Sequence, residues 1–372
     1  MNDITGSPVA LIASACRWRS TRELATSLSD VGFRVGFIGP RDHPIDNQPG
    51  SCQRFVLGSL APARTIGTAI DSLKPDIIIP ADEMIVQILH RLHRRNADLR
   101  PLIERSLGAP EHYGSVLSRV ALAEIAQEEG LAAPTTLRVT STHALPPLLK
   151  AIGLPAYLKA DASWGGVGVI RAESVEACVQ AYRRLQLMRF RDIGRSAWRM
   201  AVARDGARTP LRTARLELSL QSAVAGQPAN CAVMAWRGEM LACIEAAALN
   251  TIGPTGAATA VRILANQPMR EACGRLVKRL GLSGLIGFDF MLDSETGRAN
   301  VIELNARATQ TCHLRIGAGA DPPAAFWAAV TGRSVRSHAA ATAGDIVELF
   351  PRDASEAIEP RLLPDTQPIT SI

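Results

Sequence analysis

Two acids and an asparagine amide occur close together in a segment with the pattern of a β-hairpin. Asp289 lies in one short apolar strand pattern, Glu303 and Asn305 lie in the next, and residues 293–297 between them contain Asp, Ser and Gly, which favour turns. Side chains alternate along a strand, so Glu303 and Asn305 face the same side, and antiparallel pairing brings Asp289 level with them. Mg²⁺ prefers oxygen ligands of this kind and commonly takes its remaining ligands from water and a phosphate chain; Mn²⁺ accepts the same donors. The hairpin therefore predicts a magnesium site, with manganese as the alternative ion, beside a phosphorylated ligand.

An ordinary solvated hairpin is the alternative interpretation of these acids. It suits Asp293 and Glu295, which lie at the turn. It suits Asp289 and Glu303 less well, because both lie inside apolar runs, where an unpaired charge is costly to bury. We therefore favour the metal site for Asp289 and Glu303.

A lysine followed by a glycine-rich turn is the second feature that could bind an anion. An apolar strand pattern over 154–158 ends at Lys159, and Gly165, Gly166 and Gly168 precede the next strand pattern. Glycines let backbone N–H groups approach an anion closely, and the lysine adds a positive charge. The chain has four lysines against 37 arginines, so a lysine at this position is mildly informative. No Walker A pattern occurs, and taken alone the segment is interpreted by default as an ordinary tight turn.

These two features, together with a third, resemble the ATP-grasp superfamily. Residues 287–290 and 302–307 resemble the magnesium hairpin of that family, and Lys159 with its glycine turn resembles the strand and mobile loop that hold the nucleotide phosphates. The strand pattern that leads into residues 221–226 resembles the hinge that holds adenine and ribose. The three parts occur in the family's order, and the resemblance covers the chain from about residue 8 to about residue 333.

The resemblance implies roles for individual residues. Asp289, Glu303 and Asn305 would hold Mg²⁺. Arg307 would stabilise the γ-phosphate or an acyl phosphate, with Lys159 as the second catalytic cation. The implied nucleotide contacts are Lys159, Gly165, Gly166, Gly168, Gln221, Ala223, Val224 and Arg119.

Two of these positions depart from the family's usual residues. Gln221 stands where the hinge usually opens with a glutamate. Ser118 and Arg119 stand where many members carry a lysine at the start of a helix. Arg119 can still neutralise a phosphate, so it stays among the expected nucleotide contacts.

The resemblance also implies the chemistry. ATP-grasp ligases activate a carboxylate as an acyl phosphate and join it to an amine, with release of ADP and phosphate, and the main catalytic task is to neutralise charge on the transferring phosphoryl group. We expect an ADP-forming carboxylate-amine ligase whose partners are ATP, a small carboxylate and an amine. An ATP-grasp kinase and a nucleotide-binding regulator without turnover are the alternatives, and the resemblance leaves room for a homodimer.

The biotin-dependent carboxylases are one branch of the family that the residues after Asn305 resemble, because Arg307 and His313 follow at the same spacing. Those enzymes place a glutamate immediately before the histidine as the base for bicarbonate, whereas this chain has Cys312. A buried thiol has a raised pKa and is a poor base near pH 7. We therefore expect an organic acid, and not bicarbonate, as the activated substrate. Cys312 is expected to have a packing role and His313 a structural one, with orientation of the substrate as the alternative for His313.

The wider pattern predicts an α/β protein, with an N-terminal Rossmann-like parallel domain followed by an α+β ATP-grasp fold. In residues 1–115, apolar strand patterns alternate with helical patterns, which favours a parallel sheet covered by helices. Asp82 and Glu83 follow a strand and either line a substrate site or begin the next helix. The expected strands and helices of this part are strands 8–15, 34–38 and 76–80 and helices 20–31, 60–73 and 85–95.

We expect the ATP-grasp domain over residues 116–333, with a glycine-loop subdomain at about 151–223 and a metal subdomain at about 224–333. Residues 334–372 are expected to form a C-terminal extension. The arginine-rich segment 189–215 is expected to be a solvated insert, and a lid over ATP is the sharper alternative.

Composition and charge limit the classes of partner. An apolar content of 47% with 20% charged residues is typical of a soluble globular protein, and no apolar run is long enough for a membrane span. The net charge of +6 equals the balance of residues 189–215 alone, eight arginines against two acids, and aromatic residues are not interleaved there, so nucleic acid binding is not expected. The seven scattered cysteines, without a CxxC pair, are expected to form neither a disulfide framework nor a zinc site, and they favour a reducing cytoplasm.

Overall fold

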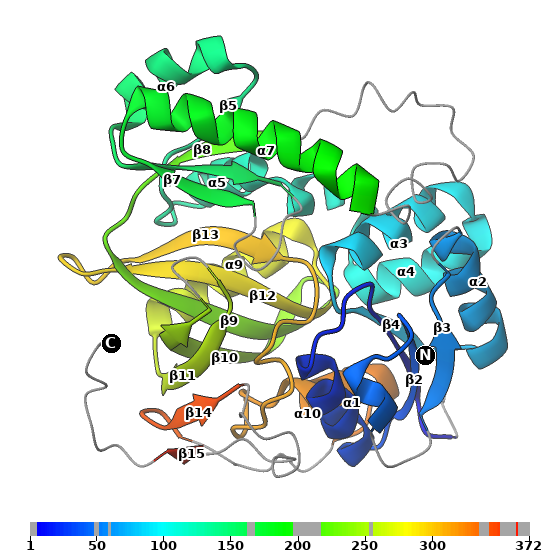
Figure 1. Ribbon diagram of the computed structural model, residues 1–372. Coiled ribbons are helices and arrows are strands. Elements are labelled where there is room, and N and C mark those ends of the chain that lie inside the picture. The colour runs from blue at the N-terminus through cyan, green and yellow to red at the C-terminus, as the bar shows by residue number, and fades with distance from the viewer. Residues whose placement is uncertain are drawn as a thin grey trace.

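The computed structural model describes residues 6–47, 52–58, 61–161, 168–195, 217–252, 256–334, 342–349 and 362–363. Three sheets organise this part of the chain, in the view of Figure 1 a parallel sheet at the lower right, a large antiparallel sheet in the centre and a smaller antiparallel sheet above it. The parallel sheet comes first in the sequence and the antiparallel sheets follow. This arrangement confirms the predicted α/β class with a parallel N-terminal part.

The first sheet is parallel, with the strand order β3-β2-β1-β4. Residues of β1 alternate between two hydrophobic clusters, because Ala10 and Ile12 pack with α1 whereas Leu11 packs with α2 and α3. Helices therefore cover both faces, as the continuous apolar strands predicted. The elements are β1 (Val9–Ala13), α1 (Ser20–Asp30), β2 (Arg34–Gly39), β3 (Gln53–Val56), α2 (Pro62–Leu73), β4 (Ile77–Pro80), α3 (Glu83–Arg95) and α4 (Arg100–Leu107).

The second sheet has the order β5-β8-β6-β7, and its neighbouring strands pair antiparallel. Its buried side chains form one cluster with the helices α6 and α7, which lie above it in Figure 1. The elements of this part are α5 (Arg119–Glu128), β5 (Thr136–Val139), α6 (Leu145–Ile152), β6 (Ala156–Ala160), β7 (Val169–Ala172), α7 (Val175–Arg195) and β8 (Leu218–Ser222).

The third sheet is antiparallel and has seven strands in the order β13-β12-β9-β10-β11-β14-β15. Strand β14, which lies in the expected C-terminal extension, pairs with β11 and with β15 and so continues this sheet. The elements are β9 (Gly226–Trp236), β10 (Glu239–Thr251), β11 (Ala258–Leu264), α9 (Gln267–Leu280), β12 (Gly284–Asp293), β13 (Ala299–Asn305), α10 (Pro322–Thr331), β14 (Ile346–Glu348) and β15 (Leu362–Leu363).

The two faces of the third sheet pack against different parts of the protein. Ala232 and Met234 of β9 belong to the cluster that contains α10 and one face of the N-terminal sheet. Cys231 and Val233, which alternate with them, belong to the cluster that contains α9 and part of α5. The third sheet therefore packs against the N-terminal part on one face and against α9 and part of α5 on the other.

Helix α7 contains the first residues of the arginine-rich segment. Residues 189–195 are helical and end α7, and residues 196–216 lie outside the described residues, so the expected insert stays a prediction. Within the described part of the chain, none of the helices combines the length and the apolar composition that a membrane span requires.

Candidate active site

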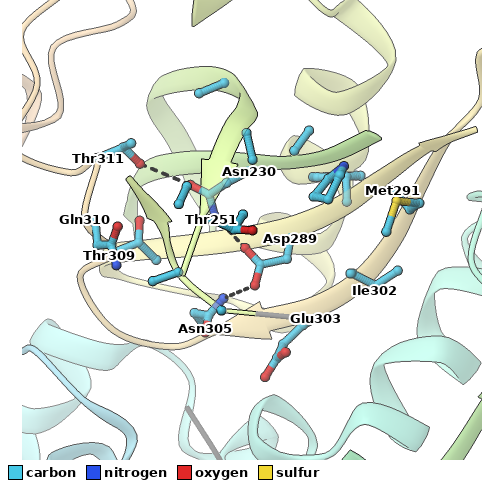
Figure 2. A pocket seen from close by; sticks show the side chains of 18 of the residues that line it. Asn230, Thr251, Asp289, Met291, Ile302, Glu303, Asn305, Thr309, Gln310 and Thr311 are labelled. Carbon is cyan, nitrogen blue, oxygen red and sulfur yellow. Dashed lines mark hydrogen bonds between the residues drawn. The ribbon is translucent and has the colours of Figure 1, made fainter. Parts of the chain in front are cut away.

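The hairpin formed by β12 and β13 brings the three expected metal ligands together. Asp289 lies directly opposite Glu303 in the antiparallel register, and Asn305 lies opposite Gly287. The Asn305 Nδ2 donates a hydrogen bond of 3.0 Å to Asp289 Oδ2 (Figure 2). A Cβ at Gly287 would lie 2.3 Å from the Thr309 Cγ2, so glycine at this position lets the segment after the hairpin pack close to the site.

Asn230 in β9 is a site residue that the sequence interpretation missed. It lies opposite Asp289 in the register of β9 and β12, and its Nδ2 donates to Asp289 Oδ1 at 2.7 Å. Its own Oδ1 accepts a hydrogen bond of 3.1 Å from the Thr311 hydroxyl (Figure 2). A polar residue within the apolar strand pattern was the available signal, but only the pairing of two distant strands shows what it contacts.

The Asp289 carboxylate lies in an environment that disfavours its charge. Burial raises its pKa, and the nearby charge of Glu303 raises it further. The amides of Asn230 and Asn305 lower the pKa by donating hydrogen bonds, without balancing the raising effects. A cation at this point would therefore be stabilised.

Arg119 connects helix α5 to both neighbouring sheets. Its Nη2 donates to Glu303 Oε1 at 2.5 Å, and its Nη1 donates to the carbonyl oxygen of Ala160 at 2.5 Å and to Asp161 Oδ1 at 3.3 Å. Ser118 caps this helix by accepting the N–H of Ala121. The guanidinium is thus held by protein acceptors, and one of them is an expected metal ligand.

Lys159 and Gln221 form a buried pair on the neighbouring strands β6 and β8. The Lys159 Nζ donates to Gln221 Oε1 at 2.6 Å, and the Gln221 Nε2 donates to the Thr136 hydroxyl at 3.0 Å. Burial lowers the pKa of the Lys159 ammonium to about 8. The charge of Glu303 raises that pKa and the charge of Arg119 lowers it. The expected hinge residue Gln221 therefore positions the lysine, and as a neutral amide it does not supply a counter-charge.

A cavity of about 300 Å³ joins these groups. This volume lies at the lower end of the range for small-molecule sites. Among the described residues, those that line the cavity with charged or polar side chains include Ser20, Arg119, Lys159, Gln221, Asn230, Asp289, Glu303, Asn305 and Arg307. The cavity also touches Trp18 from the N-terminal part and Leu349 from the C-terminal segment, so the N-terminal part and both antiparallel sheets border one site.

Only some of the remaining expected nucleotide contacts can be located relative to the cavity. Val224 lines the cavity, whereas Ala223 is not among its lining residues and donates its N–H to the carbonyl oxygen of Pro155 at 3.3 Å. Gly168 is buried, and its carbonyl oxygen accepts the N–H of Ala160. Residues 165 and 166 lie outside the described residues.

Comparison with known proteins identifies the fold. No protein-family model matches the sequence, and no curated protein matches it. The biotin carboxylase domain of the 2-oxoglutarate carboxylase of Hydrogenobacter thermophilus, solved with MgADP, ADP and bicarbonate, is 16% identical, with a TM-score of 0.63 and coverage of 91% of this chain and 74% of that chain. The L-amino acid ligase of Bacillus licheniformis is 14% identical, with a TM-score of 0.60 and coverage of 88% and 75%. The carboxyaminoimidazole ribonucleotide synthase of Aspergillus clavatus, solved with ATP, is 13% identical, with a TM-score of 0.64 and coverage of 91% and 81%.

The chain has the ATP-grasp fold. At these identities the likeness shows the fold alone, so the reaction has to be argued from the residues of this ATP-grasp site.

Arg307 is held by the N-terminal part. Its Nε donates to Glu83 Oε1 at 2.6 Å, and its Nη2 donates to Asn305 Oδ1 at 3.0 Å. Glu83 is the first residue of α3, and Asp82 before it caps the helix by accepting the N–H of Ile85 at 3.1 Å. Asp82 therefore caps the start of the helix, which was one of the two expectations for this pair of acids. Glu83 forms an ion pair with Arg307 that was not predicted.

Cys312 and His313 lie beside the ATP-grasp site without lining its cavity in the described part of the chain. Cys312 is fully buried, its Sγ accepts the N–H of Thr309 at 3.2 Å, and burial raises the pKa of its thiol. Burial lowers the pKa of His313 to about 4, so its imidazole is neutral at pH 7. Neither side chain is therefore a strong base in a position to face a substrate.

Proposed function

We propose that this chain is an ATP-dependent ligase that activates an organic carboxylate as an acyl phosphate and joins it to an amine. The observation that carries the proposal is a single cavity bordered by the ammonium of Lys159, the acids Asp289 and Glu303, and the guanidinium of Arg307. Phosphoryl transfer is catalysed mainly by placing cations around the transferring group, and this cavity supplies them from several elements. The structural likeness to a carboxylase domain and an amino acid ligase supports the same class of reaction.

Mg²⁺ fits the residues of the hairpin. Asp289, Glu303 and Asn305 offer hard oxygen donors close together, and Asp289 and Glu303 place two carboxylates opposite each other in the register. Mn²⁺ suits the same donors. When bound, the ion would neutralise charge on the transferring phosphoryl group.

Other residues of the site would bind the nucleotide and orient the metal ligands. Lys159, with the backbone of the glycine turn that includes Gly168, would hold the phosphates, and Gln221 and Val224 would border the nucleoside. Arg119 borders the same cavity and would orient Glu303 through their hydrogen bond. Asp161 shares that guanidinium, so it belongs with the residues that position the metal ligands.

Two transfers make up the reaction. A carboxylate oxygen of the first substrate attacks the γ-phosphorus of ATP, the bond to the β-phosphate oxygen breaks, and ADP leaves. The amine nitrogen of the second substrate then attacks the carbonyl carbon of the acyl phosphate, phosphate leaves, and the nitrogen loses a proton. Arg307 borders the cavity and, held by Glu83, would stabilise the charge on the phosphoryl oxygens in both transfers.

We propose that the activated substrate is an organic acid. Bicarbonate activation would need a glutamate as the base at the position where this chain has Cys312. The test measures ADP release from Mg·ATP against panels of small acids and amines. Release that needs an acid and rises when an amine is added supports the ligase. ADP release with a stable phosphorylated product would identify a kinase, and ATP binding without ADP release would identify a nucleotide-binding regulator.

The organisation of the chain belongs to the same proposal. We propose the boundaries 1–115, 116–333 and 334–372, the last segment being an extension that adds strands to the third sheet. All seven cysteines are free thiols, which supports a reducing cytoplasm. A homodimer is proposed by analogy with the carboxylase domain dimer, and light scattering of the purified protein tests it.

A further inference from the structure

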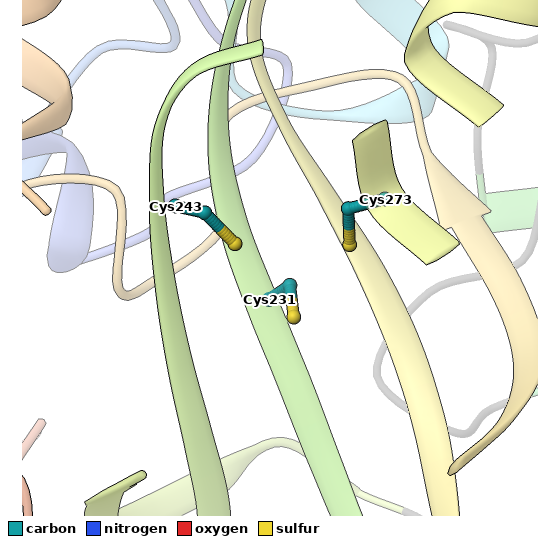
Figure 3. A group of neighbouring side chains, drawn as sticks. All are labelled: Cys231, Cys243 and Cys273. Atoms are coloured by element: carbon teal, nitrogen blue, oxygen red, sulfur yellow. The ribbon is translucent and has the colours of Figure 1, made fainter. Parts of the chain in front are cut away.

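Three buried cysteines outside the proposed active site lie together. Cys231 is in β9, Cys243 is in β10 and Cys273 is in α9, and each is fully buried. Their sulfur atoms lie within 4.8 Å of one another, and Figure 3 shows them as a triangle between the two strands and the helix. The described residues include five buried cysteines, so three of the five meet at one point although they come from three different elements.

The spacing of the sulfur atoms suits a thiophilic metal ion. A Zn–S bond is about 2.3 Å, which places the sulfur atoms of a zinc site roughly 3.8 to 4.0 Å apart. Because the three sulfur atoms already lie within 4.8 Å of one another, small side-chain rotations bring them into that range. The two strands and the helix hold the three Cα positions, so the ligands are arranged in advance.

A carboxylate that would have to turn inward to become the fourth ligand, and a compensating charge, lie beside the three sulfur atoms. Glu245 lies directly opposite Cys231 in the register of β9 and β10, which places its side chain on the same face of the sheet. Glu245 is 3% exposed, and its carboxylate pairs with Arg270 of α9 at 2.6 Å. Zinc sites in proteins are usually tetrahedral, and a carboxylate is an accepted ligand. The guanidinium would offset the negative charge that thiolates bring into the core.

We propose that Cys231, Cys243 and Cys273, with Glu245 as the fourth ligand, form a structural zinc site that fastens α9 to the third sheet. The site is separate from the carboxylate cluster, because Asn230 and Cys231 are consecutive in β9 and point to opposite faces. One face carries Asp289 and the cavity, and the other carries the sulfur atoms. The proposal does not depend on the identity of the ligase substrates.

The enclosed position of the site decides when the ion enters. All three thiols are shut off from solvent, so the ion binds before α9 packs on the strands, during folding. Without an ion, the three buried thiols would pack as small apolar side chains. When bound, the ion would add a cross-link between helix and sheet.

The test refolds the full chain from denaturant, under reducing conditions, with a molar equivalent of Co²⁺ and an excess of Mg²⁺ that occupies the carboxylate cluster. After passage over a chelating resin, we expect one cobalt per chain and a thiolate-to-cobalt charge-transfer absorption in the near ultraviolet, which oxygen ligands do not produce. Refolding with Zn²⁺ should give the same stoichiometry. A wild-type chain that lacks the absorption and retains no metal would overturn the proposal, and this result does not depend on any variant.

Variants assign the absorption to the three cysteines. Cys273→Ala should lose it, whereas Cys178→Ala, which removes an equally buried thiol from α7, should keep it. Glu245→Gln should keep the thiolate absorption and weaken cobalt binding by at least roughly 10-fold, because it removes the carboxylate ligand; the loss of an outer-shell partner alone typically costs that much. Equal cobalt retention in Cys273→Ala and Cys178→Ala would contradict the assignment.

Discussion

The ATP affinity of this protein should weaken as the pH rises through about 8, because Lys159 loses its proton in that range. Burial lowers the pKa of its ammonium to about 8, and the charges of Glu303 and Asp289 only partly restore it. The Gln221 Oε1 accepts a hydrogen bond from Lys159 in either protonation state, so it does not hold the proton in place. Below the pKa the cation contributes to phosphate binding, and above the pKa this contribution is lost.

The size of the effect follows from the contact that is lost. A hydrogen bond between an ammonium and a phosphate contributes about 1.5–3 kcal/mol. At about 1.4 kcal/mol per tenfold change, this corresponds to a Kd that rises by roughly 10- to 150-fold. Each pH unit above a pKa removes at most about a factor of ten, so the change should extend over roughly one to two units and then level off.

The assay is calorimetric titration with a non-hydrolysable ATP analogue between about pH 6.5 and about pH 10, at constant ionic strength. Lys159→Arg should bind with a nearly constant Kd over this range, because the guanidinium stays charged. Lys278→Arg, which changes an exposed lysine of α9, should show the wild-type pH dependence. A wild-type Kd that is constant over the range, or a loss of affinity that persists in Lys159→Arg, would refute the reasoning.

Three further outcomes are expected. Glu303→Gln should abolish Mg²⁺-dependent turnover while circular dichroism stays unchanged, and Mg²⁺-dependent activity at the wild-type rate would contradict the metal assignment. Glu83→Gln should lower the free energy of unfolding by about 2–3 kcal/mol, because it leaves the guanidinium of Arg307 with a weaker partner. Glu128→Gln, in an exposed pair, should change it by less than about 1 kcal/mol, and equal effects in urea unfolding would contradict this. With bicarbonate as the sole acid, ADP release should stay at background; steady release that survives Cys312→Ser would show that bicarbonate is activated.

Local sequence patterns were sufficient to predict the hairpin and the buried strands. Asp289, Glu303 and Asn305 lie in two strands joined by a short turn, so alternation and antiparallel pairing place them together. The strands β1, β2 and β4 are apolar and buried, which gives a strong pattern. Strand β3 was not predicted, because it lies at the sheet edge and its four side chains are half-buried or exposed.

Contacts between distant segments were not predictable from patterns in this sequence. Glu83 and Arg307 are 224 residues apart, and Asn230 and Asp289 are 59 residues apart. Whether the members of such a pair meet depends on how whole sheets pack. The residues next to them in the sequence carry no information about that packing. Cys231 and its two partner thiols also come together because distant segments pack on one another. The scattered positions of the cysteines in the sequence therefore gave no indication of a cluster.

The pairing of β14 with β11 has a consequence for where this protein can be shortened. A truncation near residue 334, the expected start of the C-terminal extension, would remove β14 and leave the backbone N–H and C=O groups along β11 exposed as a free sheet edge. Exposed edges recruit strands from other molecules and promote aggregation. Val347 is 1% exposed and Leu349 lines the cavity, so the same cut would also uncover apolar core and open one wall of the cavity. The last strands therefore protect the sheet against self-association as well as completing it.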